Sequence, residues 1–359
     1  MTENTPPGAS YAAAGVDIEA GETAVTLMKE WVAKAQRPES VGGLGGFAGL
    51  FDASALTRYR RPLLASATDG VGTKVAIAQR MDVHDTIGQD LVAMVVDDLV
   101  VCGAEPLFMT DYICAGKVYP ERVAAIVKGI AEGCVLAGCA LVGGETAEHP
   151  GLLEPDEYDV AGAATGVVEA DRVLGADRVR PGDAVLAMAA SGLHSNGYSL
   201  VRHVFFDRAG WALDRDVADF GRTLGEELLH PTRIYSLDCL ALAEAVEVHA
   251  FAHVTGGGLA GNLARVVPDG LHARVRRESW TPPPVFDAVG SVGRVEREEL
   301  ERTLNMGVGM VAVVPQDSVA PALALLAERN LPAWVAGEIA EAGPGLPGGG
   351  AGLTGDYAA

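Results

Sequence analysis

The chain has 359 residues, of which 49% are hydrophobic and 21% are charged, and its formal net charge is −21. This composition is typical of a globular protein long enough for two domains, and it excludes a largely disordered chain. The excess of acids argues against nucleic acid or an anionic membrane as a partner, because both are bound through clustered lysine and arginine. A phosphorylated ligand would have to be bound through a metal ion, backbone amides or a few positively charged side chains at the site, because the net charge of the protein repels it.

Neither a signal peptide nor a membrane span is expected. The first ten residues are polar, and no apolar stretch reaches the length that crosses a bilayer. The five cysteines show no zinc-binding pattern, since the gap between Cys134 and Cys139 has no histidine partner. Buried free thiols in a reducing compartment are the simple interpretation. We therefore expect a cytoplasmic protein.

The chain is expected to begin with a disordered arm over residues 1–15, followed by a helix over residues 21–37 that carries Lys29. A glycine-rich stretch with Gly45 and Gly46 comes next. Its spacing fits a relaxed dinucleotide-binding fingerprint, but no strand precedes it, so a Rossmann site is rejected. Two interpretations stay open, a loop that closes over a nucleotide or substrate and a plain flexible linker.

An apolar strand is predicted from residue 63, and it is followed by a turn whose residue types are typical of a phosphate-binding site. The turn contains Asp69, Gly70, Gly72, Thr73 and Lys74. Glycine lets the backbone approach a ligand closely, and lysine is a mobile cation suited to phosphate. The carboxylate of Asp69 is a hard oxygen ligand of the kind that Mg²⁺ prefers. The alternative is a strand followed by an ordinary turn.

Residues 86–103 are predicted to form one buried helix, because apolar positions surround the cylinder almost completely. Asp90, Asp97 and Asp98 interrupt it, and the seven-residue spacing places Asp90 and Asp97 on one face. Buried carboxylates must be paired, hydrogen-bonded or bound to a metal. We favour a metal-bridged phosphate site that includes Asp69 over a structural salt-bridge network.

The rest of the first half is predicted to continue the α/β pattern. Strands are expected at residues 107–114, 140–143 and 158–168, with a helix at residues 120–139. Glu145 follows one of these strands in a glycine-rich segment, where it could add a carboxylate to the metal cluster or belong to a capped turn. A second α/β pattern begins near residue 180. We predict domains at residues 16–173 and 174–342, and a disordered tail at residues 343–359.

Two strand-to-helix junctions in the second half are predicted anion sites. The first contains His194, Ser195 and Asn196 before a helix, where free amides bind anions; capping alone is the alternative. No nucleophile-elbow pattern surrounds Ser195, so a hydrolase is not indicated. The second junction consists of Thr255, Gly256, Gly257 and Gly258 between a strand and a helix. It is a phosphate cradle without the Gly-Lys-Ser/Thr of a P-loop.

These motifs closely resemble, in this order, those of the phosphoribosylformylglycinamidine cyclo-ligases, also called aminoimidazole ribonucleotide synthetases. The motifs that carry the resemblance lie at residues 42–47, 68–74, 84–108, 143–148, 194–202, 231–235 and 253–258. Similarity extends from about residue 11 to about residue 339. Because so many motifs agree in the same order along the chain, the resemblance is highly specific for this family.

The resemblance implies an α/β (α+β) fold with two domains, in which the N-terminal sheet pairs with its copy in a homodimer. A C-terminal α/β domain would lie beside it, with the active site in the cleft between the domains. The implied reaction forms a C–N bond: ATP drives cyclisation of formylglycinamidine ribonucleotide to 5-aminoimidazole ribonucleotide through an O-phosphorylated imidate, in de novo purine biosynthesis. ADP and phosphate are released. The implied cofactors are ATP and Mg²⁺.

The resemblance also implies roles for individual residues. The implied catalytic residues are Asp69, Lys74, Asp98 and His194. The implied metal ligands are Asp69, Asp98 and Glu145. The implied nucleotide- and phosphate-binding residues are Lys29, Gly45, Gly46, Gly70, Gly72, Thr73, Glu145, Ser195, Asn196, Thr255, Gly256, Gly257 and Gly258.

This sequence departs from the family pattern at two of its motifs, and related functions have to be weighed. Asp97 stands where relatives often carry asparagine, and Met306 replaces a cysteine common in some relatives. Selenophosphate synthetase is disfavoured, because its glycine-rich segment carries a reactive cysteine and this chain has none before Cys102. A small-molecule kinase similar to thiamine-phosphate kinase is the closest rival. A non-catalytic nucleotide-binding scaffold is disfavoured because the acids and Lys74 are intact.

Overall fold

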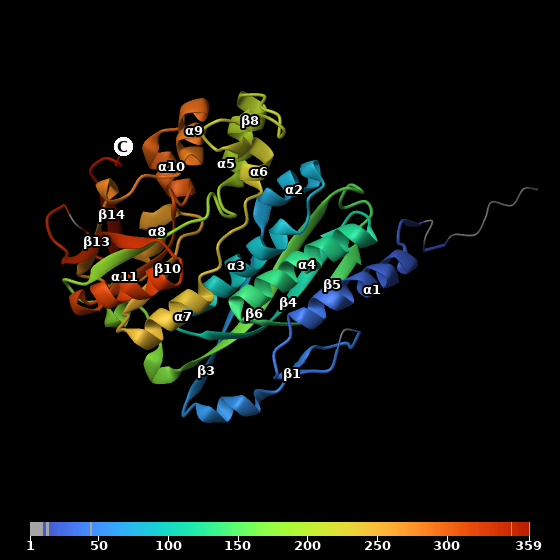
Figure 1. Cartoon of the computed structure of the whole chain (residues 1–359), viewed down its shortest axis with the longest axis horizontal. Coiled ribbons are helices and arrows are strands. Elements are labelled where there is room, and N and C mark those ends of the chain that lie inside the picture. The colour runs from blue at the N-terminus through green and yellow to red at the C-terminus, as the bar shows by residue number, and fades with distance from the viewer. Residues whose placement is uncertain (1–9, 12–13, 44, 346, 359) are drawn as a thin grey trace, which may run out of the picture.

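The computed structural model describes residues 10–11, 14–43, 45–345 and 347–358. The chain forms two α/β halves that lie side by side (Figure 1). The predicted arm at residues 1–15 lies mostly outside the described residues, so its disorder stays a prediction. Among the described residues, no helix is long and apolar enough to cross a membrane.

The N-terminal half is built on a four-stranded sheet with the order β3-β6-β4-β5. Its strands are β3 (Pro62–Gly70), β4 (Glu105–Ala115), β5 (Ala140–Glu148) and β6 (Tyr158–Glu169), preceded by the hairpin β1 (Ser40–Val41) and β2 (Leu50–Phe51). Its helices are α1 (Ile18–Lys34), α2 (Val75–Met81), α3 (Thr86–Val100) and α4 (Pro120–Ala137). Only the β4–β5 pair is parallel within this sheet.

Helices cover one face of this sheet and leave the other face open within a single chain. Along β4, Met109, Asp111 and Ile113 are buried, whereas the alternate residues Thr110 and Tyr112 are exposed. This alternation of buried and exposed residues is expected for a strand in a sheet that has only one face covered. Helices α3, α4 and α1 pack on the covered side, with α3 against β3 and β6.

The C-terminal half is built on a six-stranded sheet with the order β10-β12-β7-β13-β11-β14. Its strands are β7 (Ala184–Ala189), β10 (Ala250–His253), β11 (Leu271–Arg276), β12 (Val308–Val314), β13 (Ala333–Glu341) and β14 (Gly350–Thr354), with a separate ribbon of β8 (Asp216–Val217) and β9 (Arg222–Thr223). Its helices are α5 (Tyr198–Arg202), α6 (Leu224–Leu228), α7 (Ser236–Ala245), α8 (Gly258–Ala264), α9 (Pro284–Gly293), α10 (Arg297–Thr303) and α11 (Val319–Glu328). The predicted two-part α/β architecture is confirmed.

The prediction of a disordered tail at residues 343–359 was wrong. Strand β14 pairs in parallel with β11 and forms the edge of the C-terminal sheet. Glycines at positions 350 and 352 let the ring of His272 lie against this strand, where side chains would crowd it. Tyr357 anchors the end by a hydrogen bond to Glu301 and an edge-on contact with Trp280. The glycine-rich composition suggested flexibility, but here it permits close packing.

Helix α3 lies where the two halves meet. Its residues contact β3, β6 and α4 on the N-terminal side, and α7 and β10 on the C-terminal side. The predicted burial of this helix is confirmed, because most of its side chains have no exposed surface. It therefore places its aspartates at the boundary between the domains.

Candidate functional site

The three aspartates of α3 have different environments. Asp90 and Asp97 are fully buried on one face, as their spacing predicted. Asp98 lies on a different face and keeps 42% of its side chain exposed. Only Asp98 is therefore open to a ligand in this structure.

Asp90 and Asp97 hold the C-terminal domain in place, which corrects the metal-bridged interpretation for these two residues. Asp90 accepts the backbone N–H of Thr232 at 2.8 Å, and Asp97 accepts the backbone N–H of Tyr235 at 3.0 Å. Gln89 also donates to the backbone carbonyl of Thr232. A segment of the C-terminal domain thus runs along α3 and satisfies its buried carboxylates, as buried charges require.

Lys74 occupies a structural position that the sequence interpretation did not foresee. Its Nζ has no exposed surface and donates to Asp90 Oδ1 at 2.8 Å and to the backbone carbonyls of His194 (3.0 Å) and His230 (2.7 Å). Three acceptors satisfy all three N–H donors of an ammonium group. In this structure, Lys74 therefore joins the domains and does not reach an open phosphate site, contrary to the prediction.

Asp69, Asp98 and His253 come together at the domain boundary. Asp69 lies at the end of β3, half-buried, and accepts the backbone N–H of Gly70 at 2.7 Å. Burial and, to a smaller extent, the charge of Asp98 raise the pKa of Asp69, so the two carboxylates influence each other. His253 Nδ1 lies 2.9 Å from Asp98 Oδ1. The charges of Asp69 and Asp98 thus interact across two elements, and their joint role as metal ligands stays a prediction.

The donor set suits a magnesium–nucleotide complex better than a metal held by protein alone. No group of three or more His, Cys, Asp or Glu side chains arranged for a metal ion occurs among the described residues. Mg²⁺ is usually bound by one or two carboxylates together with substrate phosphates and water. The carboxylates of Asp69 and Asp98 fit that requirement.

Glu145 does not belong to this cluster within one chain. Glu145 on β5 is paired with Tyr112 on β4, whereas the preceding residue, Gly144, is paired with Asp111. Asp69 on β3 and Asp111 on β4 are paired with the same residue of β6, so their side chains point to the same face of the sheet. Since neighbouring rows face opposite sides of a sheet, Glu145 lies on the open face and Asp69 on the helix-covered face. The predicted third metal ligand is therefore not brought to Asp69 and Asp98.

His194 lies in the cleft in a neutral form. It adopts a left-handed backbone conformation with φ of 63°, and its Nε2 accepts the backbone N–H of Ser191. Burial, together with the charges of His253 and Lys74, lowers the pKa of His194 well below its usual range. His194 Nδ1 and His253 Nε2 are buried without a hydrogen-bond partner among the described residues. Such orphaned nitrogens are candidates for contact with a ligand.

The glycine junction at residues 255–258 faces the loop that carries Asn196. A Cβ on Gly256 would lie 3.8 Å from Asn196 Nδ2. Asn262, which the sequence analysis missed, donates to the backbone carbonyls of Thr255, Gly256 and Gly258 and so shapes the loop from inside. Gly258 has φ of 69°, and a Cβ there would lie 1.7 Å from the carbonyl oxygen of Glu301, so no other residue fits.

The turn after β3 also reaches the C-terminal domain. Gly72 has φ of 74°, which favours glycine, and the exposed Thr73 hydroxyl lies 3.2 Å from the hydroxyl of Ser199. Ser195 is buried, and its hydroxyl lies 3.5 Å from that of Thr232. Thr73 is thus placed at the cleft mouth, whereas Ser195 faces the interior.

Two predicted nucleotide contacts line a separate cavity. Lys29 on α1 and Glu145 on β5 border a cavity of about 550 Å³, together with the buried Asp111. Burial raises the pKa of Asp111 to about 7. Gly45 and Gly46 lie in the β1–β2 loop, next to the fully exposed ring of Phe47. None of these residues meets the Asp69–Asp98 pair within the single chain.

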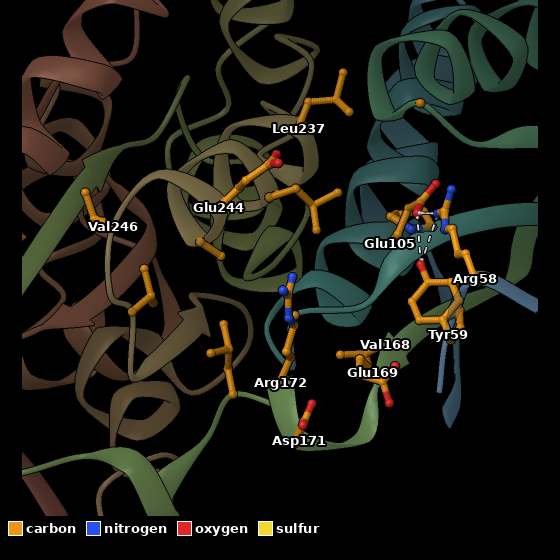
Figure 2. A pocket seen from close by; sticks show the side chains of 18 of the residues that line it. Arg58, Tyr59, Glu105, Val168, Glu169, Asp171, Arg172, Leu237, Glu244 and Val246 are labelled. Atoms are coloured by element: carbon orange, nitrogen blue, oxygen red, sulfur yellow. Dashed lines mark hydrogen bonds and ion pairs between the residues drawn. The ribbon is translucent and has the colours of Figure 1, made fainter. Parts of the chain in front are cut away.

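Another cavity, of about 1320 Å³, is lined by none of the predicted site residues. Figure 2 shows the cluster of Arg58, Tyr59 and Glu105 on one side of it and Leu237 and Glu244 on the other. Several of its charges are already paired with each other, as Arg58 is with Glu105. The candidate functional site is therefore the group of residues at the domain boundary that consists of Asp69, Asp98, His253, His194 and the glycine junction.

Comparison with known proteins identifies the family. A model described as "AIR synthase related protein, N-terminal domain" matches residues 51–168, and one described as "AIR synthase related protein, C-terminal domain" matches residues 180–345. A phosphoribosylformylglycinamidine cyclo-ligase of Geobacillus kaustophilus (strain HTA426) is 52% identical over 342 residues, which cover 95% of this chain and 99% of the relative. The chain belongs to this cyclo-ligase family.

Other cyclo-ligases match nearly as far, and solved structures share the fold. The cyclo-ligase of Anaeromyxobacter sp. (strain K) is 53% identical over 94% of this chain and 97% of its own length. Thiamine-monophosphate kinase from Stenotrophomonas maltophilia K279a has a TM-score of 0.66 at 21% identity, covering 92% of this chain and 96% of that chain. The hydrogenase maturation protein HypE in complex with ATP has a TM-score of 0.62 at 20% identity, with 90% and 88% covered. At these low identities, the structures show a shared fold alone.

Proposed function

We propose that this chain catalyses the ATP-dependent cyclisation of formylglycinamidine ribonucleotide to 5-aminoimidazole ribonucleotide, with release of ADP and phosphate, in purine biosynthesis. The observation that carries the proposal is the identity of about half of all residues to cyclo-ligases across almost the whole of both chains. The residues at the domain boundary support it, because Asp69 and Asp98 interact there and His253, which contacts Asp98, leads into the glycine junction.

The proposed reaction needs activation of an amide-type oxygen, because that oxygen is a poor leaving group. Transfer of the γ-phosphoryl group of ATP to the formamide oxygen makes it a phosphate leaving group. The neighbouring amidine nitrogen then attacks the same carbon, the five-membered ring closes and phosphate departs. Holding nitrogen and carbon together in one cleft supplies a high effective concentration.

Each residue of the cleft has a proposed task. Asp69 and Asp98 would hold Mg²⁺, which neutralises the charge of the nucleotide phosphates when bound. The glycine junction at residues 256–258 would bind a phosphate through backbone amides, with its shape held by Asn262. His194 would donate a hydrogen bond from Nδ1 to the substrate, because the neutral ring accepts at Nε2 and therefore carries its proton on Nδ1, which has no other partner among the described residues.

We also propose a homodimer in which the open faces of two N-terminal sheets meet. The open side of β3 carries Leu64, which is 65% exposed, together with Ser66 and Thr68. The face is thus only partly polar, and pairing would bury its apolar part. Light scattering of the purified protein tests the mass, and a monomer at micromolar concentration would contradict this part of the proposal.

A small-molecule kinase is the second candidate, supported only by the shared fold with thiamine-monophosphate kinase. The deciding experiment measures phosphate release from Mg–ATP with and without formylglycinamidine ribonucleotide, alongside a colour assay for the aminoimidazole product. Release that depends on this substrate and matches product formation supports the cyclo-ligase. Transfer of phosphate to thiamine monophosphate, with no aminoimidazole formed, would replace it by the kinase. A cytoplasmic location is proposed as for a soluble metabolic enzyme and is checked by cell fractionation.

A further inference from the structure

The loop that carries His194 is held from inside the C-terminal domain by a buried amide that has no role in the proposed reaction so far. Asn305 lies between α10 and β12 and is almost fully buried. Its Nδ2 donates to the backbone carbonyls of Gly192 and Leu193, at 2.9 and 3.1 Å. Its Oδ1 accepts the backbone N–H of Gly307 at 2.7 Å. The amide therefore joins two backbone segments that lie more than 100 residues apart in sequence, and both of its N–H donors are used.

The turn that follows Asn305 is itself fixed by other parts of the domain. Trp280 Nε1 donates to the backbone carbonyl of Met306 at 2.9 Å. The backbone carbonyl of Gly307 accepts the N–H of Ala190, also at 2.9 Å. Asn305 therefore extends from a well-held support toward the loop of His194.

His194 needs such support because its backbone is strained. Its φ of 63° lies in the left-handed region, which residues other than glycine rarely adopt. Such a conformation costs free energy and persists only where the surrounding contacts enforce it. Three consecutive backbone carbonyls of this loop are bonded, those of Gly192 and Leu193 by Asn305 and that of His194 by Lys74. Asn305 thus supplies two of these three contacts.

The same loop geometry determines which nitrogen of the His194 ring can donate to a ligand. Nε2 accepts the backbone N–H of Ser191 at 3.1 Å, so the neutral ring carries its proton on Nδ1. Strand β12 leaves room for the ring at Gly309, where a Cβ would lie 2.5 Å from His194 Cε1. The contact with Ser191 lies within the loop and depends on its fold. A change of the loop would free Nε2 to carry the proton instead.

We propose that Asn305 is a positioning residue that holds the loop of His194 in the geometry in which Nδ1–H is presented to the substrate. The catalytic part of this role rests on the proposed cyclo-ligase function, whereas the positioning itself can be measured without any substrate. The alternative role is purely structural, in which Asn305 stabilises only the turn to Gly307. The two roles differ in what happens to the His194 ring when the amide is lost.

The first measurement determines the tautomer of His194 in the absence of substrate. Full-length protein with isotope-labelled histidine is studied by NMR at neutral pH, and the signals of His194 are assigned from their absence in His194→Gln. In the wild type the proton should lie on Nδ1. Asn305→Ser keeps a hydroxyl that can accept from Gly307 but does not reach the loop, so the proton should move to Nε2 or exchange between both nitrogens. Asn305→Asp keeps the shape of the side chain, loses both donors as a carboxylate and should show the same change.

Gln36→Ser is the matched control, with circular dichroism as the check that each variant is folded. Gln36 Nε2 also donates to two backbone carbonyls, those of Val32 and Leu141, in the N-terminal domain. Its variant loses the same number of hydrogen bonds and should keep the proton of His194 on Nδ1. A proton that stays on Nδ1 in a folded Asn305→Ser or Asn305→Asp variant would overturn the proposal.

A double-mutant comparison tests the catalytic part. In Asn305→Ser, kcat should fall roughly 10- to 100-fold, because a small displacement of a catalytic group can cost this much, while KM for ATP should change little. In the His194→Gln background the same change should lower kcat by no more than about twofold, since its effect passes through His194. Equal losses in both backgrounds would show a purely structural role and overturn the proposal. If the wild type formed no aminoimidazole product although the tautomer changed as expected, the proposed function would fail and the positioning of His194 by Asn305 would stand.

Discussion

His253 Nδ1 lies 2.9 Å from Asp98 Oδ1, and the two residues belong to different domains. His253 is buried at the end of β10, two residues before the glycine junction begins, whereas Asp98 keeps 42% of its side chain exposed. A proposed metal ligand of one domain is therefore aligned by the element that leads to the phosphate loop of the other.

We predict that His253 is a positioning residue whose loss is partly rescued by asparagine. His253→Phe should lower kcat about 10-fold or more, in the range seen when partners of metal-binding side chains are removed. His253→Asn should recover part of the rate, since an amide can still donate to Asp98. Steady-state kinetics on both variants check this, and equal kcat values in phenylalanine and asparagine variants would contradict the role.

Asp69→Asn and Asp98→Asn are each predicted to abolish turnover while the protein stays folded. Both carboxylates are assigned to the magnesium–nucleotide complex, and loss of one charge-stabilising group typically costs roughly 100- to 1,000-fold in rate. Phosphate release gives the rate, and thermal melting confirms the fold. Asp214→Asn, at an exposed carboxylate far from the cleft residues in sequence, is the control. A near wild-type rate in either test variant would remove that residue from the site.

Lys74→Met is predicted to act mainly on stability. Its Nζ is fully buried against Asp90, and removal of one partner of a buried ion pair typically destabilises a protein by about 3–5 kcal/mol. Urea unfolding should show a lower midpoint for Lys74→Met, and Lys74→Met with Asp90→Leu should recover part of it. If Lys74 instead contacts phosphate, the single variant would unfold like the wild type and lose only activity.

Asp97→Asn is predicted to stabilise the protein above neutral pH. Burial raises the pKa of Asp97 to about 7, despite the opposing charge of His253 and the hydrogen bond from Tyr235. The folded state therefore binds a proton more tightly than the unfolded state, where the pKa is about 3.9. Stability from this group is fully present below about pH 4 and is lost as pH rises through about 7.

The asparagine variant does not titrate, so its advantage should grow with pH. At pH 8 the gain should be on the order of 1 kcal/mol or more, because one pKa unit corresponds to about 1.4 kcal/mol. At pH 5 the gain should be smaller by roughly 2–3 kcal/mol, because only about one pH unit separates this pH from the unfolded pKa. Urea midpoints at both pH values measure the difference. The same gain at pH 5 and pH 8 would show that Asp97 does not titrate with folding.

Truncation after Ala342 is predicted to destabilise the C-terminal domain. It removes β14 and leaves the hydrogen-bonding edge of β11 open to water or to other chains. Thermal melting should shift down and aggregation should increase on heating. Tyr357→Phe, which loses only the hydrogen bond to Glu301, should shift the melting temperature much less. An unchanged melting temperature after truncation would show that the strand is dispensable.

The sequence predicted the elements well because their signals are local. The apolar run of α3 and the alternation along β6 are visible in short windows. It did not predict the different environments of the three aspartates, because the partners of Asp90 and Asp97 lie about 140 residues away in sequence. Lys74 was misjudged for the same reason. Nothing near Lys74 in sequence reveals that two distant backbone carbonyls enclose its ammonium group.

Parts of the site were within reach of the sequence. A histidine at the end of a strand, three residues before a run of three glycines, could have been added to the acid cluster as His253. Asn262 carries no comparable signal, since a single amide in a short helix is common. The location of Glu145 on the open face depended on the register of β5 against β4, which the sequence does not specify.

The contact of α3 with the segment from Thr232 to Tyr235 limits how the protein can move. Rotation of one domain against the other would break the hydrogen bonds of Asp90 and Asp97, both of which are buried. Breaking these hydrogen bonds would leave the buried carboxylates of Asp90 and Asp97 without partners. Bending of one domain against the other at this contact is therefore costly in free energy. Opening and closing around substrates must then rely on surface loops such as the exposed β1–β2 hairpin with Phe47. The placement of Asp98 relative to the glycine junction is thus fixed when the two domains pack against each other during folding.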